Sequence, residues 1–149
     1  MEERFETFTV LINRISRNIR KIKNREMEAR GLRSAHVSCL YYLYTAKHLT
    51  AAELCERCEE DKATVSRALD HLEQCGYLAP RSADAKRYKA PLSLTEQGST
   101  VGGEIAAKIN GVLQAVSDSL TESQRVEFYR SLNAISSRLD AIAEGEGMG

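Results

Sequence analysis

Apolar residues recur every three or four positions through most of this chain, and the recurrence stops only between residues 77 and 95. Spacing of this kind is typical of amphipathic helices that bury one face. The interrupted stretch holds both prolines of the chain, Pro80 and Pro91, which a central strand of a large sheet would not accommodate. The sequence therefore predicts a mainly α fold of about six helices with one small β-ribbon.

The helices are predicted from the apolar periodicity and from residues that start or stop a helix. They cover residues 4–29, 35–46, a short segment from about 51, 62–75, roughly 96–118 and about 122–143. Several starts carry a side chain that can cap a helix, namely Ser34, Thr50, Asp61 and Thr121. Gly31 and Gly76 are natural stops. Short strands are predicted at 77–82 and 89–95, around a polar tip at 83–88.

The bulk properties are those of an ordinary globular protein. The chain has 149 residues, enough for one domain with a buried core, and 42% of them are hydrophobic and 28% charged. No run of about 18 apolar residues occurs that could span a membrane. The N-terminal sequence MEERFETFTV begins with acidic residues and lacks an apolar signal segment. We therefore expect a cytoplasmic protein with no membrane partner.

The zero net charge hides an uneven distribution along the chain. Residues 1–33 contain nine basic and five acidic residues, and residues 61–90 contain six and four. Residues 34–60 contain two basic and four acidic residues, and residues 91–149 contain four and eight. A polyanion responds to a local basic face rather than to the total charge. The two basic stretches are therefore compatible with a nucleic-acid partner, and the acidic C-terminal part balances them.

The order of predicted elements in residues 34–95 is that of a helix-turn-helix followed by a wing. In this arrangement the helix at 62–75 presents its N-terminal half to the major groove of DNA. Arginine can grip guanine with two hydrogen bonds, serine and threonine hydroxyls contact bases or phosphates, and a basic wing tip suits the flanking backbone or a minor groove. The candidate DNA-binding residues are Lys62, Thr64, Ser66, Arg67, Arg81, Lys86, Arg87, Tyr88 and Lys89.

Residues 61–98 resemble the MarR family of bacterial regulators. The predicted recognition helix follows the family pattern K-x-T-V-S-R-x-x-x-x-L-E-x-x-G over residues 62–76, and the later L-T-x-x-G falls on residues 94–98. The order of helices matches the family over nearly the whole chain, so the resemblance implies one MarR-like chain over residues 1–149.

The predicted wing departs from the family pattern in its spacing. Asp84 lies three residues before Arg87 and ten before Leu94, a longer interval than the family has. Arg87 is carried over as the wing arginine. The family usually gives the aspartate the role of bracing that arginine, and the longer spacing leaves the role of Asp84 open.

The resemblance implies a homodimer that binds a near-palindromic operator in double-stranded DNA. Residues 1–33 and 96–145 would form the dimerisation helices around the lobe at 34–95. The near-heptad spacing in the first helix fits a face that meets a partner helix as well as its own core. The candidate dimerisation residues are Phe8, Ile12, Ile15, Ile135, Leu139 and Ile142.

A small effector is a second partner that the resemblance implies. The family often has a ligand cleft between the dimerisation helices and the DNA-binding lobe, which would take an aromatic or amphipathic molecule. The candidate cleft residues are His36, Tyr41 and Tyr44. The alternatives are ordinary core positions for the tyrosines and a partly exposed, hydrogen-bonding role for His36. The predicted function is a transcriptional repressor that such an effector releases from DNA.

The four cysteines, Cys39, Cys55, Cys58 and Cys75, are expected to be free thiols in a reducing compartment. Cys55 and Cys58 form one C-x-x-C pair, which is only part of the ligand set of a closed zinc site, so no metal and no cofactor are predicted. A redox-responsive regulator using Cys55 and Cys58 is one alternative, and a winged-helix protein-interaction module is another. An interaction module would expose apolar residues on the 62–75 helix, whose outward positions are basic or hydroxylic instead. No catalytic motif occurs, so no enzyme is expected.

Overall fold

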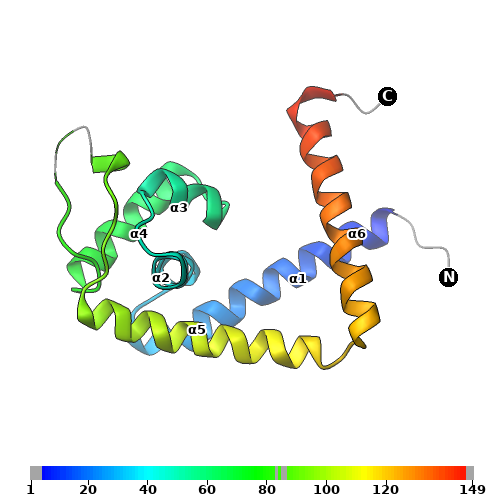
Figure 1. The fold of residues 1–149 in the computed structure, drawn as a ribbon, viewed down its shortest axis with the longest axis horizontal. Coiled ribbons are helices and arrows are strands. Elements are labelled where there is room, and N and C mark those ends of the chain that lie inside the picture. The colour runs from blue at the N-terminus through cyan, green and yellow to red at the C-terminus, as the bar shows by residue number, and fades with distance from the viewer. Residues whose placement is uncertain (1–4, 83, 85–86, 147–149) are drawn as a thin grey trace. The chain divides into compact units, whose positions relative to one another are not determined.

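The computed structural model describes residues 5–82, 84 and 87–146 and is almost entirely helical over them. The elements (Figure 1) are α1 (Phe5–Glu26), η1 (Glu28–Arg30), α2 (Ser34–Ala46), α3 (Ala51–Cys58), α4 (Lys62–Gln74), η2 (Arg87–Lys89), α5 (Glu96–Ser117), α6 (Glu122–Ala141) and η3 (Ile142–Glu146). The prediction of a mainly α fold with about six helices is confirmed. No helix in the described part of the chain combines the length and apolar character needed to cross a membrane.

The chain divides into two compact units, Met1–Lys108 and Ile109–Gly149, and each is described by itself. In the first unit α2, α3 and α4 pack against one another, and the connection that follows α4 lies beside them (Figure 1). The side chains that are almost completely buried include Leu32, Leu40, Leu54, Leu69, Leu72, Leu78 and Ile105. The apolar stripe predicted for the 62–75 helix therefore faces this core.

Side-chain caps determine where the two helices of the helix-turn-helix begin. The Thr50 hydroxyl accepts a hydrogen bond from the Glu53 amide at 3.1 Å, and Asp61 Oδ1 accepts one from the Thr64 amide at 2.6 Å. Both caps were expected, because a short polar side chain satisfies an amide that the first helical turn leaves unpaired. Between the two helices, Glu59 takes a φ of 54° and ends α3.

The start of α2 differs from the prediction that Ser34 caps it. Ser34 is the first residue of the helix, and Arg33 occupies the capping position. His36 Nδ1 accepts a hydrogen bond from the Arg33 amide at 2.9 Å, and Asn24 Oδ1 of α1 accepts one from the Ser34 amide at 2.7 Å. Side chains from the helix interior and from α1 thus perform the role that the local pattern assigned to the serine hydroxyl.

The ribbon predicted at 77–82 and 89–95 is not confirmed as a pair of strands. Over the described residues the pairing consists of two isolated antiparallel bridges, Leu78 with Leu94 and Thr50 with Pro91. Lys89, which was expected to begin a strand, lies in the 3₁₀ turn η2. The wing is therefore a loop fastened at its base rather than a regular ribbon.

The short pairing has a cause in the sequence. Backbone hydrogen bonds flank the Leu78–Leu94 bridge, from the Ala79 amide to the Ser93 carbonyl at 2.9 Å and from the Thr95 amide to the Tyr77 carbonyl at 3.0 Å. In the same register residues 81 and 91 would pair next, and Pro91 has no N–H to donate. The Leu92 amide donates instead to the Leu49 carbonyl at 2.8 Å, which joins this segment to the turn before α3.

A hydroxyl and two glycines attach the beginning of α5 to the end of α4. The Thr95 hydroxyl donates to the Gly76 carbonyl at 2.6 Å and accepts from the Gly98 amide at 3.0 Å. At Gly98 the helix approaches the preceding backbone so closely that a Cβ would lie 1.9 Å from the Tyr77 carbonyl oxygen. The L-T-x-x-G pattern is therefore a structural clamp that needs glycine in its last position.

In the second unit, none of the described residues is buried. α6 begins at the expected capping box, in which Thr121 and Gln124 exchange hydrogen bonds of 2.8 and 3.2 Å. Its exposed apolar side chains include Val126, Phe128, Tyr129, Ile135 and Leu139. In the first unit, α1 likewise exposes Val10, Leu11, Ile12, Ile15 and Ile19. Tertiary packing of an apolar face supplies most helical stability, and these exposed apolar faces lack such packing within the described residues.

The clamp predicts that Gly98→Ala destabilises the protein strongly. The added methyl group would overlap the Tyr77 carbonyl, which is backbone and cannot rotate aside, so we expect a loss of about 3 kcal/mol in the free energy of unfolding. Gly111→Ala in the same helix is the matched control, because a Cβ there meets nothing within 4 Å. It should leave stability unchanged or raise it by up to about 1 kcal/mol. Equal effects of the two substitutions in urea denaturation would contradict the clamp.

Candidate nucleic-acid interface

The N-terminal half of α4 presents a polar stripe to the outside while its other face is held in the core. The buried face consists of Val65, Ala68, Leu69 and Leu72. The outward stripe consists of Lys62 and Arg67, which are exposed, and Thr64 and Ser66, which are half-buried. These four were predicted from the sequence to contact DNA, and all four lie outside the buried stripe of the helix. Cations and hydroxyls held on a rigid helix can contact both base edges and phosphates.

The Asp61 cap fixes the first turn of this helix. Hydrogen bonds from Thr64, first from its amide and then from its hydroxyl, lower the pKa of the Asp61 carboxyl, and the charge of Arg67 lowers it further. Arg67 Nη2 also donates to Thr64 Oγ1 at 3.4 Å. The cap therefore persists to a pH below the ordinary range of aspartate. The hydrogen bond to Thr64 holds the Arg67 guanidinium beside the first turn.

Tyr88 attaches η2 of the wing to both helices of the helix-turn-helix. Its hydroxyl lies 3.1 Å from Cys55 Sγ on α3, and Lys62 Nζ lies 4.3 Å from the centre of its ring. The contact with Cys55, together with burial, raises the pKa of Tyr88 to about 12. The tyrosine was predicted as part of an exposed wing tip. It packs inward instead and positions the cation of Lys62.

Arg81 is held by two carboxylates of α4. Its Nε donates to Glu73 Oε2 at 3.0 Å, its Nη2 pairs with Asp70 Oδ1, and only 9% of its side-chain surface is exposed. We therefore correct its predicted role from DNA contact to fastening the wing base onto α4. Sequence reasoning missed Asp70 and Glu73. Their signal was present, since two carboxylates three residues apart share a helix face and an arginine follows.

The remaining wing residues are described unequally. Lys89 is exposed in η2, and Arg87 contributes its backbone to η2. The Arg87 side chain and all of Lys86 lie outside the described part of the chain. A groove of about 200 Å³ between α4 and the wing is lined by Ala51, Lys62, Ser66, Leu69, Arg81, Asp84 and Tyr88.

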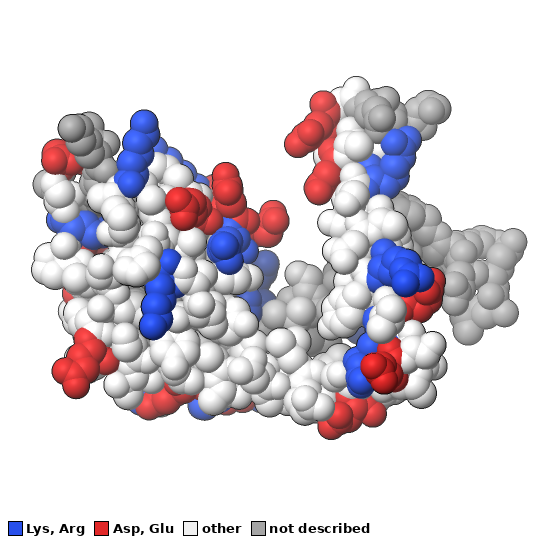
Figure 2. Space-filling view, in the orientation of Figure 1, with Lys and Arg blue, Asp and Glu red and all other residues white. Residues whose placement is uncertain are grey.

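Charges of both signs are interspersed on the surface of the first unit. On the face shown in Figure 2 its Lys and Arg side chains are scattered among uncharged and acidic ones and form no continuous basic field. Long-range attraction of a polyanion is therefore modest on this face. Contacts made by individual side chains of α4 and the wing decide how well a nucleic acid would bind.

The cysteines of the C-x-x-C pair contact different partners. Cys55 meets Tyr88, whereas Cys58 hydrogen-bonds with Cys39 of α2. That hydrogen bond, helped by the charge of Lys23, lowers the pKa of Cys58, and the same bond together with burial raises the pKa of Cys39. All four cysteines are free thiols. Among the residues that the structure describes, no three His, Cys, Asp or Glu side chains are grouped to hold a metal ion.

The three candidate effector residues make different contacts in the described part of the chain. His36 stacks on His71, and Tyr41 makes an edge contact with Tyr42 at a ring distance of 5.2 Å. Tyr44 lines a cavity of about 340 Å³ with Leu43, Lys47, His48, Leu92, Ser93, Leu94 and Ser99. Its ring packs on Gly102 and Gly103 of α5. A Cβ at Gly102 would lie 2.9 Å from Tyr44 Cβ, and a Cβ at Gly103 would lie 3.4 Å from the Tyr44 hydroxyl.

Comparison with known proteins adds three findings to this geometry. A family model described as MarR family matches residues 30–87, which include α2, α3 and α4. The HTH-type transcriptional regulator YwoH of Bacillus subtilis is 33% identical over 98 residues, which are 66% of this chain and 71% of that protein. The HTH-type transcriptional repressor YetL of the same organism is 24% identical over 132 residues, which are 87% of this chain and 79% of that protein.

A solved structure is similar over most of the chain. The MepR–DNA complex of S. aureus matches with a TM-score of 0.77 and 21% identity, covering 89% of this chain and 98% of MepR. At this level of identity the similarity establishes the fold, and it extends well beyond the matched family segment.

The Arg81 pairs predict a measurable coupling between the wing and α4. Arg81→Met keeps the aliphatic stem and removes both ion pairs, so we expect a loss of about 1 kcal/mol in the free energy of unfolding, limited by the partial exposure of Asp70 and Glu73. A double-mutant cycle with Glu73→Gln should show a favourable coupling energy. Arg130→Met, which removes an exposed pair with Glu127, should change stability little. A zero coupling energy between Arg81 and Glu73 would contradict the assignment.

Proposed function

The chain belongs to the MarR family of winged-helix transcription regulators, and from this membership we propose that it is a homodimeric repressor of a near-palindromic operator. It acts by binding double-stranded DNA in the cytoplasm, and membership of the family favours regulation over catalysis. The observation that carries the proposal is the outward stripe of α4, whose cations and hydroxyls stand on a helix with a buried opposite face.

Within the stripe, different side chains have different tasks. Arg67 is exposed beside the first turn and can grip a guanine with two hydrogen bonds, and the Thr64 and Ser66 hydroxyls can contact bases or phosphates. Lys62 and Lys89 are suited to phosphates, because a lysine ammonium is a compact point charge without a directional pattern. In a dimer the two α4 helices would occupy successive major grooves about 34 Å apart.

A fluorescence-anisotropy titration with DNA from upstream of the protein's own gene tests this proposal. Arg67→Ala should reduce the preference for the specific site over random DNA by roughly tenfold or more. A contact to one base through two hydrogen bonds contributes about 1–3 kcal/mol of discrimination. Lys89→Ala should weaken binding to both DNAs equally and lower the slope of log K against log salt by about one.

Arg130→Ala on α6 is the control for these two variants and should change neither quantity. The absence of a specific complex at low salt, with dimeric protein in the cuvette, would refute DNA regulation by this chain.

The apolar surfaces on α1 and α6 support the homodimer. Ile12 and Ile15 are 38% and 51% exposed, and Ile135 and Leu139 are 39% and 42% exposed. Phe8 and Ile142 are half-buried, and Ile142 lies just past the end of α6, in η3. Burying one such side chain contributes about 1.5–3 kcal/mol, so a row of them on a single chain favours association. A second copy of this chain is the proposed occupant.

Ile15→Glu is expected to shift the dimer to monomer. In a two-fold symmetric interface the substitution acts twice, so the dimer dissociation constant should rise by about 100-fold or more in sedimentation equilibrium. Arg17→Glu introduces the same charge on the opposite side of α1 and should leave the dimer intact. If Ile15→Glu sediments like the wild type, the first helix is not part of the interface.

We place the effector site in the cavity beside Tyr44. Leu43 and Leu92 give it an apolar floor, and Lys47 supplies a cation at its rim, a combination that suits a small aromatic or amphipathic anion. The cavity adjoins the segment that leads from the wing to α5, because Leu92, Ser93 and Leu94 line it and Leu94 pairs with Leu78 at the wing base. A ligand there would therefore alter the wing base. Native mass spectrometry of the purified dimer is the direct way to detect a retained molecule.

A further inference from the structure

Two histidines from different helices stack in the first unit. His36 lies in the first turn of α2 and His71 in the C-terminal half of α4, with ring centroids 4.3 Å apart and 29° between the ring planes. His71 Nε2 lies 3.2 Å from the Gly31 carbonyl oxygen, in the turn between α1 and α2, and 3.6 Å from Cys75 Sγ. The pair therefore joins three elements, namely this turn, the start of α2, and α4.

The α2 cap makes His36 a base that cannot be protonated without structural cost. His36 Nδ1 accepts the hydrogen bond from the Arg33 amide, so the neutral ring carries its proton on Nε2. A second proton can go only to Nδ1, where it would face the Arg33 N–H. Protonation of His36 therefore removes the hydrogen bond that caps α2. His71 differs, because its Nε2 can keep donating to Gly31 in either charge state.

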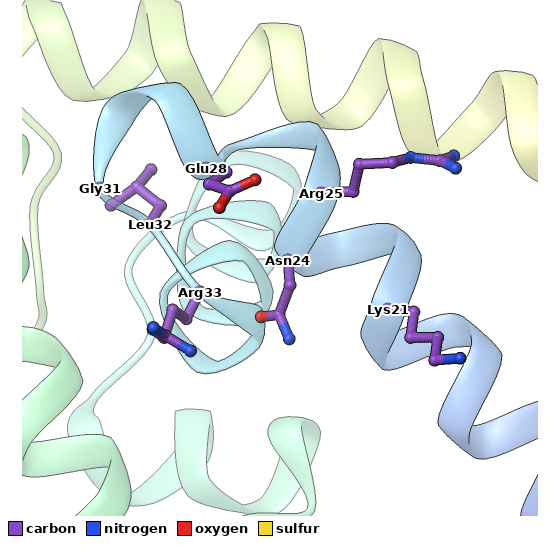
Figure 3. Close-up of a pocket in the computed structure, with 7 residues that line it drawn as sticks. All are labelled: Lys21, Asn24, Arg25, Glu28, Gly31, Leu32 and Arg33. Carbon is purple, nitrogen blue, oxygen red and sulfur yellow. The ribbon is translucent and has the colours of Figure 1, made fainter.

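The surroundings of His36 also disfavour a cation. His71 of α4 and Arg33 of the turn face it, and the N-terminus of α2 is the positive end of a helix dipole. Burial, followed by the charges of His71 and Arg33, lowers the pKa of His36 below its ordinary value. The outer side of the turn is a groove of about 540 Å³ (Figure 3), lined by Lys21, Asn24, Arg25, Glu28, Gly31, Leu32 and Arg33. The charged members of this lining include three cations and one carboxylate.

We propose that His36 and His71 form an acid-sensitive joint between α2 and the recognition helix α4. This joint holds α4 in position less firmly when the pH falls. At neutral pH the two rings stack and the Arg33 amide is bound. On acidification His36 gains a proton at Nδ1, and the α2 cap opens. The His36 ring must move to release the Arg33 amide, so α4 then loses the stacking contact between its C-terminal half and the start of α2. The consequence for DNA rests on the proposed function, because α4 is the helix assigned to read it.

The direction of the effect follows from the lowered pKa of His36. The unfolded chain, with a histidine pKa of about 6.5, binds a proton that the folded chain resists. The contribution of the joint is therefore complete above a pH of about 6.5 and decreases as the pH falls below it. One such proton changes an equilibrium constant by up to about tenfold per pH unit.

The test uses the full chain as wild type, His36→Gln and Arg130→Gln. Glutamine at this helical position can accept the capping amide and does not titrate. Wild-type affinity for the operator should begin to fall only below a pH of about 6.5, because the pKa of His36 is lowered, and it should then fall by up to about tenfold per pH unit. The affinity of His36→Gln should change about twofold or less over the same range. Arg130→Gln makes the same kind of substitution at an exposed residue of α6, and it should keep the wild-type pH dependence.

Two further readouts separate this inference from DNA binding. Urea unfolding without DNA should show the same pH dependence in the wild type and its loss in His36→Gln. In an NMR titration, His71→Gln should raise the pKa of His36 toward its ordinary value. Equal pH slopes for wild type and His36→Gln would overturn the joint. If no DNA complex forms at a pH of about 7.5, the proposed function fails, while the unfolding series still decides about the joint.

Discussion

The burial of one stripe of α4 is the constraint on which the first unit depends. Leu69 and Leu72 are completely buried, and each contributes about 1.5–3 kcal/mol by leaving water. Turning the helix by one residue would rotate it by about 100°, exposing these leucines and burying charged neighbours. The outward direction of Arg67 is therefore fixed from behind by residues that never contact a ligand. A regulator built this way can vary its outward residues without losing its fold.

Three separate attachments hold the C-terminal half of α4 and the residues that follow it. Arg81 connects the wing base to Asp70 and Glu73, Gly98 brings α5 against Tyr77, and His71 meets the turn at Gly31. Each joins this region to a different element. The N-terminal half is held by the burial of Val65 and Leu69 and by the contact of Lys62 with Tyr88. Its outward side chains stay accessible because only the opposite face of the helix is buried.

The sequence predicted what local chemistry decides and missed what distant partners decide. Asp61, Thr50 and Thr121 cap helices as expected, since each cap involves residues within one turn. Ser34 does not cap α2, because Asn24 of another helix takes its amide. Arg81 was predicted to contact DNA because the sequence alone does not show which acidic residues lie beside a basic wing residue in the folded chain. Its two carboxylates become neighbours only once the chain has turned at Gly76.

Protonation opens a cap near each end of α4, but at a different pH. At the N-terminal end, the hydrogen bonds that make the cap lower the pKa of Asp61. The pH must therefore fall below the ordinary aspartate range before the first turn opens. At the other end, the His36 ring is held neutral by a bond that protonation removes. If the proposed joint exists, a pH below the lowered pKa of His36 changes how α4 is held, while its reading turn keeps its shape until the pH falls below the ordinary aspartate range. Affinity for DNA would then change through the position of the helix, with the groups that recognise bases still intact.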